Sequence, residues 1–95
     1  MSGGAVLAGP VLLSSELGLA VLSAIKAENS DVQVQDRGTY LRVLRSPRCA
    51  VSRRGIETAL GRPVQLRSDL ELCMPSFRGR LSVDDERATW EASEP

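Results

Sequence analysis

Two helices are predicted from the spacing of apolar residues. The first begins near Glu16, after a serine at position 14 or 15 that can cap it. Its apolar residues recur at the intervals that share one helix face: Leu17, Ala20, Val21, Ala24 and Ile25. Asn29 ends this helix and is a candidate for the left-handed conformation. The second helix is capped by Ser52 and ends at Gly61, with Pro63 just beyond it.

Strands are predicted where apolar and polar residues alternate. They fall at five places: residues 9–13, 32–35, 39–45, 49–51 and 88–92. The first is expected at a sheet edge, because Pro10 has no N–H to donate to a neighbouring strand. The second and third form a hairpin around the turn at 36–38. In this hairpin Leu41 and Val43 face inward, whereas Tyr40 and Arg42 face outward.

The stretch from Leu70 to Val83 predicts two more strands, joined by a rigid corner. Apolar and polar residues alternate on both sides of Pro75. Pro75 fixes its own φ and lacks a donor, so the connection is not an ordinary tight hairpin. One side of both strands can be buried while the corner stays available to a partner. For Phe77 the pattern leaves two interpretations open, a core position and a contact position.

These elements predict a single α+β domain. It is made of two βαββ-type halves, at about 9–46 and 47–93, whose small mixed or antiparallel sheets pack against two to three helices. Residues 1–8 are expected to be a flexible tail before the domain at 9–93. A chain of 95 residues corresponds to one domain, and with only three aromatic residues its core must rely on aliphatic side chains. Trp90 is expected to be the large aromatic residue of that core.

The charge pattern argues against binding to nucleic acid or to a membrane. Twelve basic and twelve acidic residues cancel, so no overall field attracts the chain to polyanions. The middle third is nevertheless basic, with arginines at 37, 42, 45, 48, 53 and 54 near Tyr40, which keeps RNA binding open as an alternative. The structural interpretation is that these arginines pair with Asp31, Asp36 and Glu57. Without a signal peptide or a long apolar stretch, a cytoplasmic location is expected.

The sequence offers little catalytic chemistry. It has no histidine and no paired acid and base in an apolar setting. Cys49 and Cys73 form no CxxC motif and are expected to be reduced and buried, although an enzyme that works through one of them is a third alternative. The acidic triplet at 84–86 is typical of a solvated turn rather than of a metal site. We therefore expect no catalytic, cofactor-binding or metal-binding residues.

Five segments, taken in order, resemble one known family. They are Gly9 to Val11, Ala24 to Asn29, Asp36 to Val43, Ala59 to Pro63 and Leu70 to Arg80. Across about residues 9–91 the chain resembles the small effector, or coupling, proteins of soluble bacterial di-iron monooxygenases. This family includes the methane monooxygenase regulatory protein and the phenol, toluene and alkene monooxygenase effectors.

The resemblance implies a non-catalytic, cofactor-free regulator that binds the oxygenase (hydroxylase) component. Such a partner carries a carboxylate-bridged non-haem di-iron centre and oxidises aromatic or alkene hydrocarbons, in a system that also has a reductase, with or without a Rieske ferredoxin. The effector would dock over the iron site and change the access of substrate, O₂ and electrons. The residues expected to contact the partner are Tyr40, Arg42, Met74, Pro75, Ser76, Phe77, Arg78 and Gly79. A small ferredoxin-like module that binds a ligand or RNA is the alternative.

Overall fold

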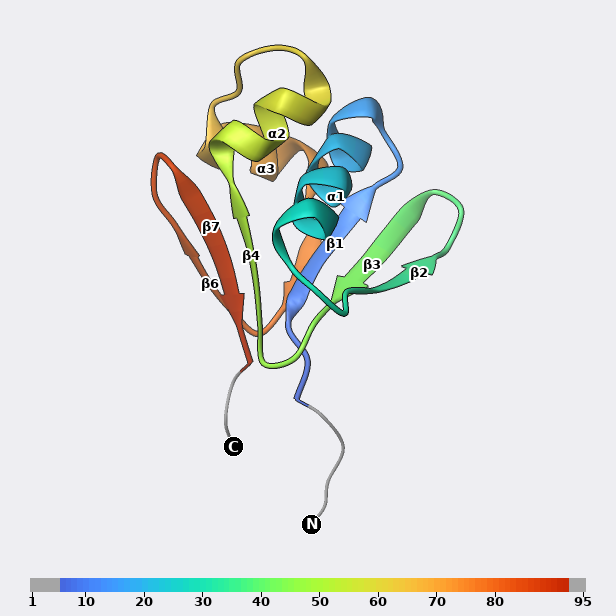
Figure 1. The fold of residues 1–95 in the computed structure, drawn as a ribbon. Helices are drawn as coiled ribbons and strands as arrows, with labels where there is room; N and C mark the ends of the chain where they lie inside the picture. Colours follow the sequence, from blue (N-terminus) through green and yellow to red (C-terminus); the bar gives the residue numbers. More distant parts are fainter. Residues whose placement is uncertain (1–5, 93–95) are drawn as a thin grey trace.

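The computed structural model describes residues 6–92. The elements follow one another in this order: β1 (Gly9–Leu13), α1 (Glu16–Glu28), β2 (Gln33–Asp36), β3 (Tyr40–Leu44), β4 (Arg48–Ser52), α2 (Arg53–Leu60), α3 (Leu66–Cys73), β5 (Ser76–Arg78), β6 (Arg80–Val83) and β7 (Arg87–Glu91). They build two antiparallel sheets, one in the order β2-β3-β1-β5 and the other in the order β4-β7-β6. The sheets converge at the lower end of Figure 1 and diverge upward, with α1 between them. The predicted α+β class is confirmed.

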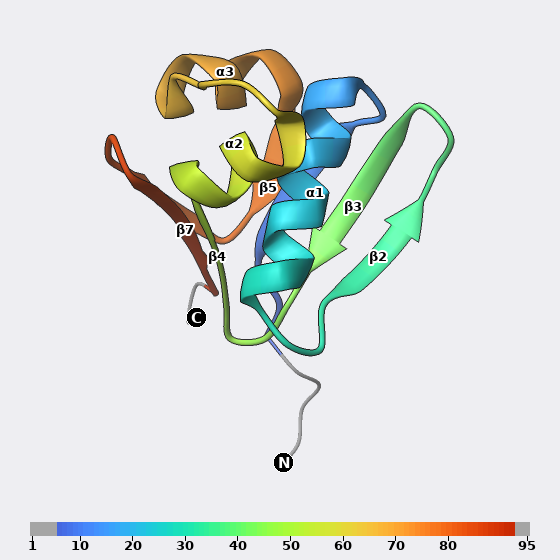
Figure 2. The same cartoon turned by 45° about the horizontal axis from the view of Figure 1, so that its top comes forward.

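The two predicted helices are confirmed, and serine residues begin both. The Ser15 hydroxyl accepts a hydrogen bond from the Gly18 N–H at 3.1 Å, and Ser52 caps α2 through the Gly55 N–H at 2.9 Å. Most of the apolar stripe of α1 is buried, with Leu17 partly buried. The helix packs against β1, β4 and α2 (Figures 1 and 2). Gly61 ends α2 in the left-handed conformation. The sequence pattern therefore placed both helices correctly.

The prediction that Asn29 is left-handed is wrong. Asn29 is extended, with φ of −135°, and Asp31 two residues later has φ of 57°. The reason lies in the Asn29 side chain, which bonds to the backbone of β4 and therefore fixes the orientation of this residue.

Residues 66–73 form helix α3, so the strand predicted from Leu70 to Met74 is wrong. Leu66, Leu70 and Cys73 are buried at helical spacing, whereas Leu72 is 72% exposed on the other side. A strand would have placed Leu72 inside together with Leu70. The alternation of Leu70, Leu72 and Met74 predicted a strand. The helical period appears only when Leu66, which precedes this segment, is included.

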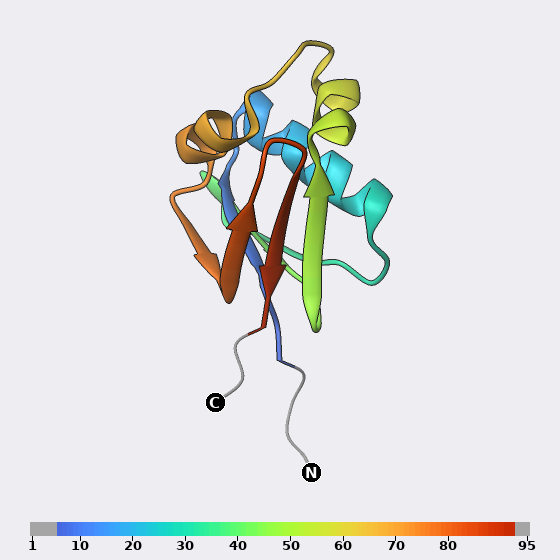
Figure 3. The same ribbon diagram turned by 90° about the vertical axis from the view of Figure 1, so that its left-hand side faces the viewer.

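The strand predicted after Pro75 divides at Gly79. β5 pairs with β1 in the four-stranded sheet, whereas β6 pairs with β7 in the other sheet (Figure 3). Gly79 has φ of 97°, and a Cβ there would lie 2.4 Å from the carbonyl oxygen of Glu91. Only glycine fits this crossing without a rearrangement. The two halves are thus interleaved, because a strand of the second half completes the sheet of the first.

β1 is an inner strand, and its predicted position at a sheet edge is wrong. It pairs with β3 on one side and with β5 on the other. Just before it, Ala8 and Arg45 exchange two backbone hydrogen bonds of 3.0 and 2.9 Å, and Ala8, expected in the tail, is buried. The β1–β3 register places Pro10 opposite Val43. Because Pro10 has no N–H, one backbone hydrogen bond between these strands is missing at this pair. Residues 1–5 of the predicted tail lie outside the described residues.

The core lies between the sheets and the helices. Trp90 of β7 is its largest fully buried side chain, and Leu12, Ile25 and Ile56 are buried from other elements. The Trp90 Nε1 has no hydrogen-bond partner among residues 6–92, and we attribute its contribution to stability to packing.

Side chains from the end of α1 and from Arg45, which follows β3, occupy the free edge of β4. Asn29 accepts a hydrogen bond from the Ala50 N–H at 3.3 Å and donates one to the Ala50 carbonyl at 2.7 Å. Glu28 accepts from the Ser52 N–H at 2.9 Å. Arg45 donates to the Arg48 carbonyl at 2.7 Å. The edge of β4 therefore pairs with its own chain and is closed to another strand.

Replacing Trp90 by alanine is expected to lower the free energy of unfolding by about 3–5 kcal/mol, because it empties the largest core position. Denaturant unfolding measures the change. Leu72→Ala is the matched control and should change stability by less than about 0.5 kcal/mol, since Leu72 is exposed. An unchanged stability of the Trp90 variant would contradict this account of the core.

Replacing Asn29 by alanine should cost about 1–3 kcal/mol, because the N–H and carbonyl of Ala50 lose their partners. Ser30→Ala is the control, since within the described part of the chain the Ser30 hydroxyl accepts a single, long hydrogen bond of 3.5 Å, from Arg45. Equal thermal unfolding of the two variants would show that the β4 edge does not depend on the Asn29 side chain.

Candidate functional site

The strand register places four of the predicted contact residues on one face of the four-stranded sheet. Directly paired residues of antiparallel strands point to the same side. Arg42 pairs with Val11, and Val11 pairs with Ser76. We call this side the outer face, and its residues are Val11, Leu13, Gln33, Gln35, Tyr40, Arg42, Leu44, Ser76 and Arg78. The prediction that Tyr40 and Arg42 point away from Leu41 and Val43 is confirmed, because the latter two are buried in the core.

The centre of the outer face is apolar and open to solvent. Leu13 is 39% exposed and Tyr40 is 37% exposed, and the two residues pair across β1 and β3. Leu44 is buried but is not part of the main core cluster, as expected for a residue on the opposite side of the sheet. An exposed tyrosine beside an exposed leucine is a combination that protein interfaces favour.

The charges of the outer face are all positive. Arg42 and Arg78 carry them, and no strand residue of this face is acidic. Within the described residues 6–92, neither guanidinium has an ion pair or a side-chain hydrogen bond to the protein. Arg37, which follows β2, adds a third guanidinium and contacts Gln35 on the same face at 3.4 Å. The face thus offers arginine donors around an apolar centre, which suits a surface that carries carboxylates.

The other predicted contact residues are placed differently. The Met74 N–H donates to the Leu70 carbonyl at 2.8 Å to end α3, and its side chain packs against the core. Phe77 pairs with Pro10 and so lies on the inner side of the sheet, although 43% of it is exposed because β5 is an edge strand. Pro75 is exposed in the connection, and Gly79 serves the crossing between sheets. The core interpretation of Phe77 is therefore not supported.

Sequence reasoning missed Val11, Leu13 and Arg37. The alternation along residues 9–13 does place Val11 and Leu13 on one side of a strand. The alternation does not show which strands lie beside this one, and Pro10 predicted that it would be an edge strand. The register shows that β1 lies between the strands that carry Arg42 and Ser76.

The two cysteines do not form a reactive site. Both are free and buried, and burial raises the pKa of each thiol to about 11. A thiol with such a pKa stays protonated near neutral pH and is a weak nucleophile. Among residues 6–92, no group of three or more His, Cys, Asp or Glu could hold a metal ion. None of the helices in this part of the chain has the length and apolar character that crossing a membrane requires.

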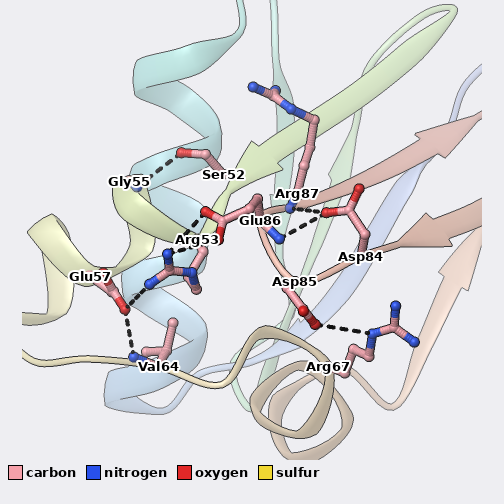
Figure 4. A network of polar contacts seen from close by, with 10 residues as sticks. All are labelled: Ser52, Arg53, Gly55, Glu57, Val64, Arg67, Asp84, Asp85, Glu86 and Arg87. Atoms are coloured by element: carbon pink, nitrogen blue, oxygen red, sulfur yellow. Dashed lines mark hydrogen bonds and ion pairs between the residues drawn. The ribbon is translucent and has the colours of Figure 1, made fainter.

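The acidic triplet at 84–86 holds the β6–β7 turn to the helices (Figure 4). Asp84 accepts hydrogen bonds from the N–H groups of Glu86 and Arg87 at 2.8 and 2.9 Å. The Arg53 guanidinium forms ion pairs with the carboxylates of Glu86, at 3.0 Å, and of Glu57, at 2.9 Å. These contacts make the triplet a structural element. They also confirm the expected pairing of an arginine with Glu57, whereas the expected pairs with Asp31 and Asp36 are absent from the ion pairs of residues 6–92.

The lowered pKa of Glu57 predicts that the free energy of unfolding decreases in acid. Hydrogen bonding from the Val64 N–H, and then the Arg53 guanidinium, hold the pKa of Glu57 below its ordinary value of 4.5. The native state therefore binds this proton less readily than the unfolded chain, and the stabilisation disappears as the pH falls through the lowered pKa. Denaturant unfolding of wild type and Glu57→Gln should converge as the pH falls below 4.5. Curves that stay parallel over this range would contradict the assignment.

Comparisons with known proteins show the family and the fold of this chain. The MmoB/DmpM family profile matches residues 7–91. The effector subunit of the alkene monooxygenase system of Xanthobacter autotrophicus (strain ATCC BAA-1158 / Py2) is 40% identical over 86 residues, which cover 88% of this chain and 84% of that protein. A chain in the structure of the phenol hydroxylase–regulatory protein complex superposes with a TM-score of 0.81 at 21% identity, over 92% of this chain and 99% of that one. The soluble methane monooxygenase regulatory protein B gives a TM-score of 0.70 at 20% identity, over 98% of this chain and 70% of that one. The predicted resemblance is confirmed, and the chain belongs to the MmoB/DmpM family.

Proposed function

We propose that this chain is the effector subunit of a multicomponent di-iron monooxygenase of alkene monooxygenase type. It binds the oxygenase component and regulates turnover without taking part in the chemistry. The observation that carries this proposal is the outer face, where residues from three strands present an apolar centre and two arginines that form no ion pair within residues 6–92. The 40% identity to an alkene monooxygenase effector subunit supports the choice of system.

A sheet face is suited to this task because it is already ordered before the partner arrives. Binding through flexible segments costs conformational entropy, whereas the residues of β1, β3 and β5 are fixed by backbone pairing on neighbouring strands. Exposed Tyr40 and Leu13 supply apolar area, and Arg42 and Arg78 supply directional donors. The chain can then change the oxygenase only through a difference in its affinity for two oxygenase conformations.

The proposed division of labour leaves cofactor chemistry to the partner. The oxygenase component would hold the di-iron centre, and a reductase would deliver electrons to it. This chain would carry no cofactor and act in the cytoplasm. The buried thiols and the structural use of the acidic triplet support a chain that acts through contact.

Changes at Ser76 and Arg78 are expected to weaken stimulation of the oxygenase. Both residues are exposed on the outer face, so Ser76→Asp and Arg78→Ala should leave the melting temperature within about 1–2 °C of wild type. Titration of each variant into a purified alkene monooxygenase oxygenase and its reductase, with epoxide formation as the readout, should require at least about tenfold more effector.

Arg62→Ala is the control for charge, because Arg62 is also exposed but follows α2, away from the outer face. It should stimulate as wild type does. Variants at Ser76 and Arg78 that melt early, yet stimulate normally while folded, would make these positions structural. No stimulation by the wild-type chain would contradict the proposed function itself.

A further inference from the structure

The sheet of β4, β7 and β6 also has a side that points away from the core. Ala88 and Trp90 of β7 are buried, so the residues that alternate with them point outward. Figure 3 views the sheet from this side, with α1 behind it. We call this surface the arginine face, and the strand register gives its residues as Arg48, Ala50, Ser52, Arg80, Ser82, Arg87, Thr89 and Glu91.

The charges of the arginine face are mainly positive. Glu91 is its one acidic residue, and the register places it between Arg48 on β4 and Arg80 on β6. Glu91 forms an ion pair with Arg48 at 3.7 Å. Arg80 and Arg87 belong to no ion pair within residues 6–92. The face therefore keeps guanidinium groups that can bind carboxylates from outside the chain.

A hollow of about 350 Å³ opens on the arginine face beside the edge of β4. Arg45 is fixed at this edge, because its guanidinium donates to the carbonyls of Ser30, at 2.6 Å, and of Arg48, at 2.7 Å. Carbonyls do not neutralise its charge, and no carboxylate of residues 6–92 pairs with it. The residues that line the hollow are Asn29, Arg45, Arg48, Ala50, Arg87 and Thr89. None of them is acidic.

A second hollow, of about 490 Å³, lies beside the first, and Arg48 lines both. Arg80 and Glu91 also line the second hollow. Between the arginines the sheet carries short side chains, such as those of Ala50 and Thr89. A segment of another protein can therefore come close to the strands and still meet arginine side chains around it.

Two further carboxylates border the arginine face, and the fold uses both. Glu28 accepts hydrogen bonds from the Ser52 N–H at 2.9 Å and from the Ser52 hydroxyl at 2.7 Å. Asp84 accepts one from the Arg87 N–H at 2.9 Å. Neither forms an ion pair with an arginine side chain of the face among residues 6–92. These carboxylates leave the guanidinium groups free to bind a partner.

We propose that the arginine face binds an acidic segment of a second protein. Carboxylates of this segment occupy the first hollow, between Arg45, Arg48 and Arg87, and reach Arg80 in the second. The arginine face and the outer face lie on opposite sides of the molecule, because the two sheets diverge around α1 (Figures 1 and 3). Binding at the arginine face therefore does not depend on what the outer face binds.

The shape of the face favours a polypeptide over a small anion. Arg48 and Arg80 lie on strands to either side of β7, so their backbones are about 10 Å apart. One small anion cannot contact both, whereas carboxylates spaced along a polypeptide can. A water molecule takes up about 30 Å³, so the first hollow also has room for several side-chain groups.

The chemistry of the face favours a protein over a nucleic acid. Proteins that bind single strands stack bases on aromatic side chains, and the arginine face has no aromatic residue. Trp90, the aromatic residue of this sheet, is buried on the other side. The chain as a whole is neutral, so it also lacks the overall positive charge that attracts a phosphate backbone.

Titration of the isotope-labelled intact chain with a peptide of alternating glutamate and serine, followed by amide NMR signals, tests the proposal. The signals of Ala50, Ser82 and Thr89 should shift, whereas those of Leu13 and Tyr40 on the outer face should not. Raising the NaCl concentration from about 20 mM to about 200 mM should weaken binding at least about tenfold, because salt screens exposed charges.

Charge reversal identifies the arginines that bind. The double variant Arg80→Glu with Arg87→Glu should bind the peptide at least about tenfold more weakly than wild type. Arg54→Glu with Arg62→Glu is the matched control, because it changes the net charge equally at two exposed positions on and after α2. It should bind within about threefold of wild type. Thermal unfolding verifies that both variants are folded.

An equal loss of binding in the two double variants would overturn the proposal, because binding would then follow net charge alone. The absence of any shift up to about 1 mM peptide would also overturn it, as would shifts confined to Leu13 and Tyr40. Tighter binding of a single-stranded oligothymidylate than of the peptide would assign the face to nucleic acid instead. The same shifts with inorganic phosphate alone would make the hollow a small-anion site and overturn the proposal too.

Discussion

The packing of α1 between two diverging sheets is the constraint on which the rest of the structure depends. Its buried residues Val21, Ala24 and Ile25 lie in the same core as Leu12 of β1 and Val51 of β4. The helix therefore supplies the interior for both sheets at once. Its last residues also close the edge of β4, so the same helix fixes the position of the three-stranded sheet. Because α1 covers only the inner side of the four-stranded sheet, Tyr40 and Leu13 on the other side remain exposed to solvent.

The interleaving of the two halves turns that open side into one continuous surface. β5 belongs to the second half of the chain but pairs with β1, which places Ser76 opposite Val11 and Arg78 opposite Gly9. On its other side, Val11 pairs with Arg42. Gly79 makes this possible, because the chain must cross between the sheets within one residue at a positive φ. The surface is basic although the whole chain is neutral. Among residues 6–92 the acidic residues lie on helices and turns, in the other sheet, as Glu91 does, or on the inner side of β2, as Asp36 does.

Much of the fold could be predicted from the sequence because several elements have a strong period and a clear end. Ser15 and Ser52 begin helices, Gly61 ends one, and the hairpin around Gly38 has both alternation and turn residues. The failures have local causes. Leu70, Leu72 and Met74 alternate as in a strand, whereas the burial of Leu66, Leu70 and Cys73 follows a helical period.

The sequence predicted only the part of the site that depends on local alternation. Tyr40 and Arg42 follow from alternation within one hairpin, which is local information. Their neighbours come from pairing between distant segments, and nothing in the spacing of residues 9–13 indicates that β5 lies beside β1. The preference of proline for edge strands gave a wrong prediction here. Pro10 lies in an inner strand, where one backbone hydrogen bond of the sheet is missing. Arg78 was predicted as part of the exposed corner around Pro75, and its surroundings came only with the register.

Hydroxyl-radical footprinting of the chain, alone and bound to the oxygenase component, tests the central claim most directly. The account predicts that Leu13 and Tyr40 become protected on binding, because they form the apolar centre of the outer face. Leu19, an exposed residue of α1, should react equally in both states. Protection of Leu19 with no change at Leu13 and Tyr40 would contradict the account and place the contact on the helices.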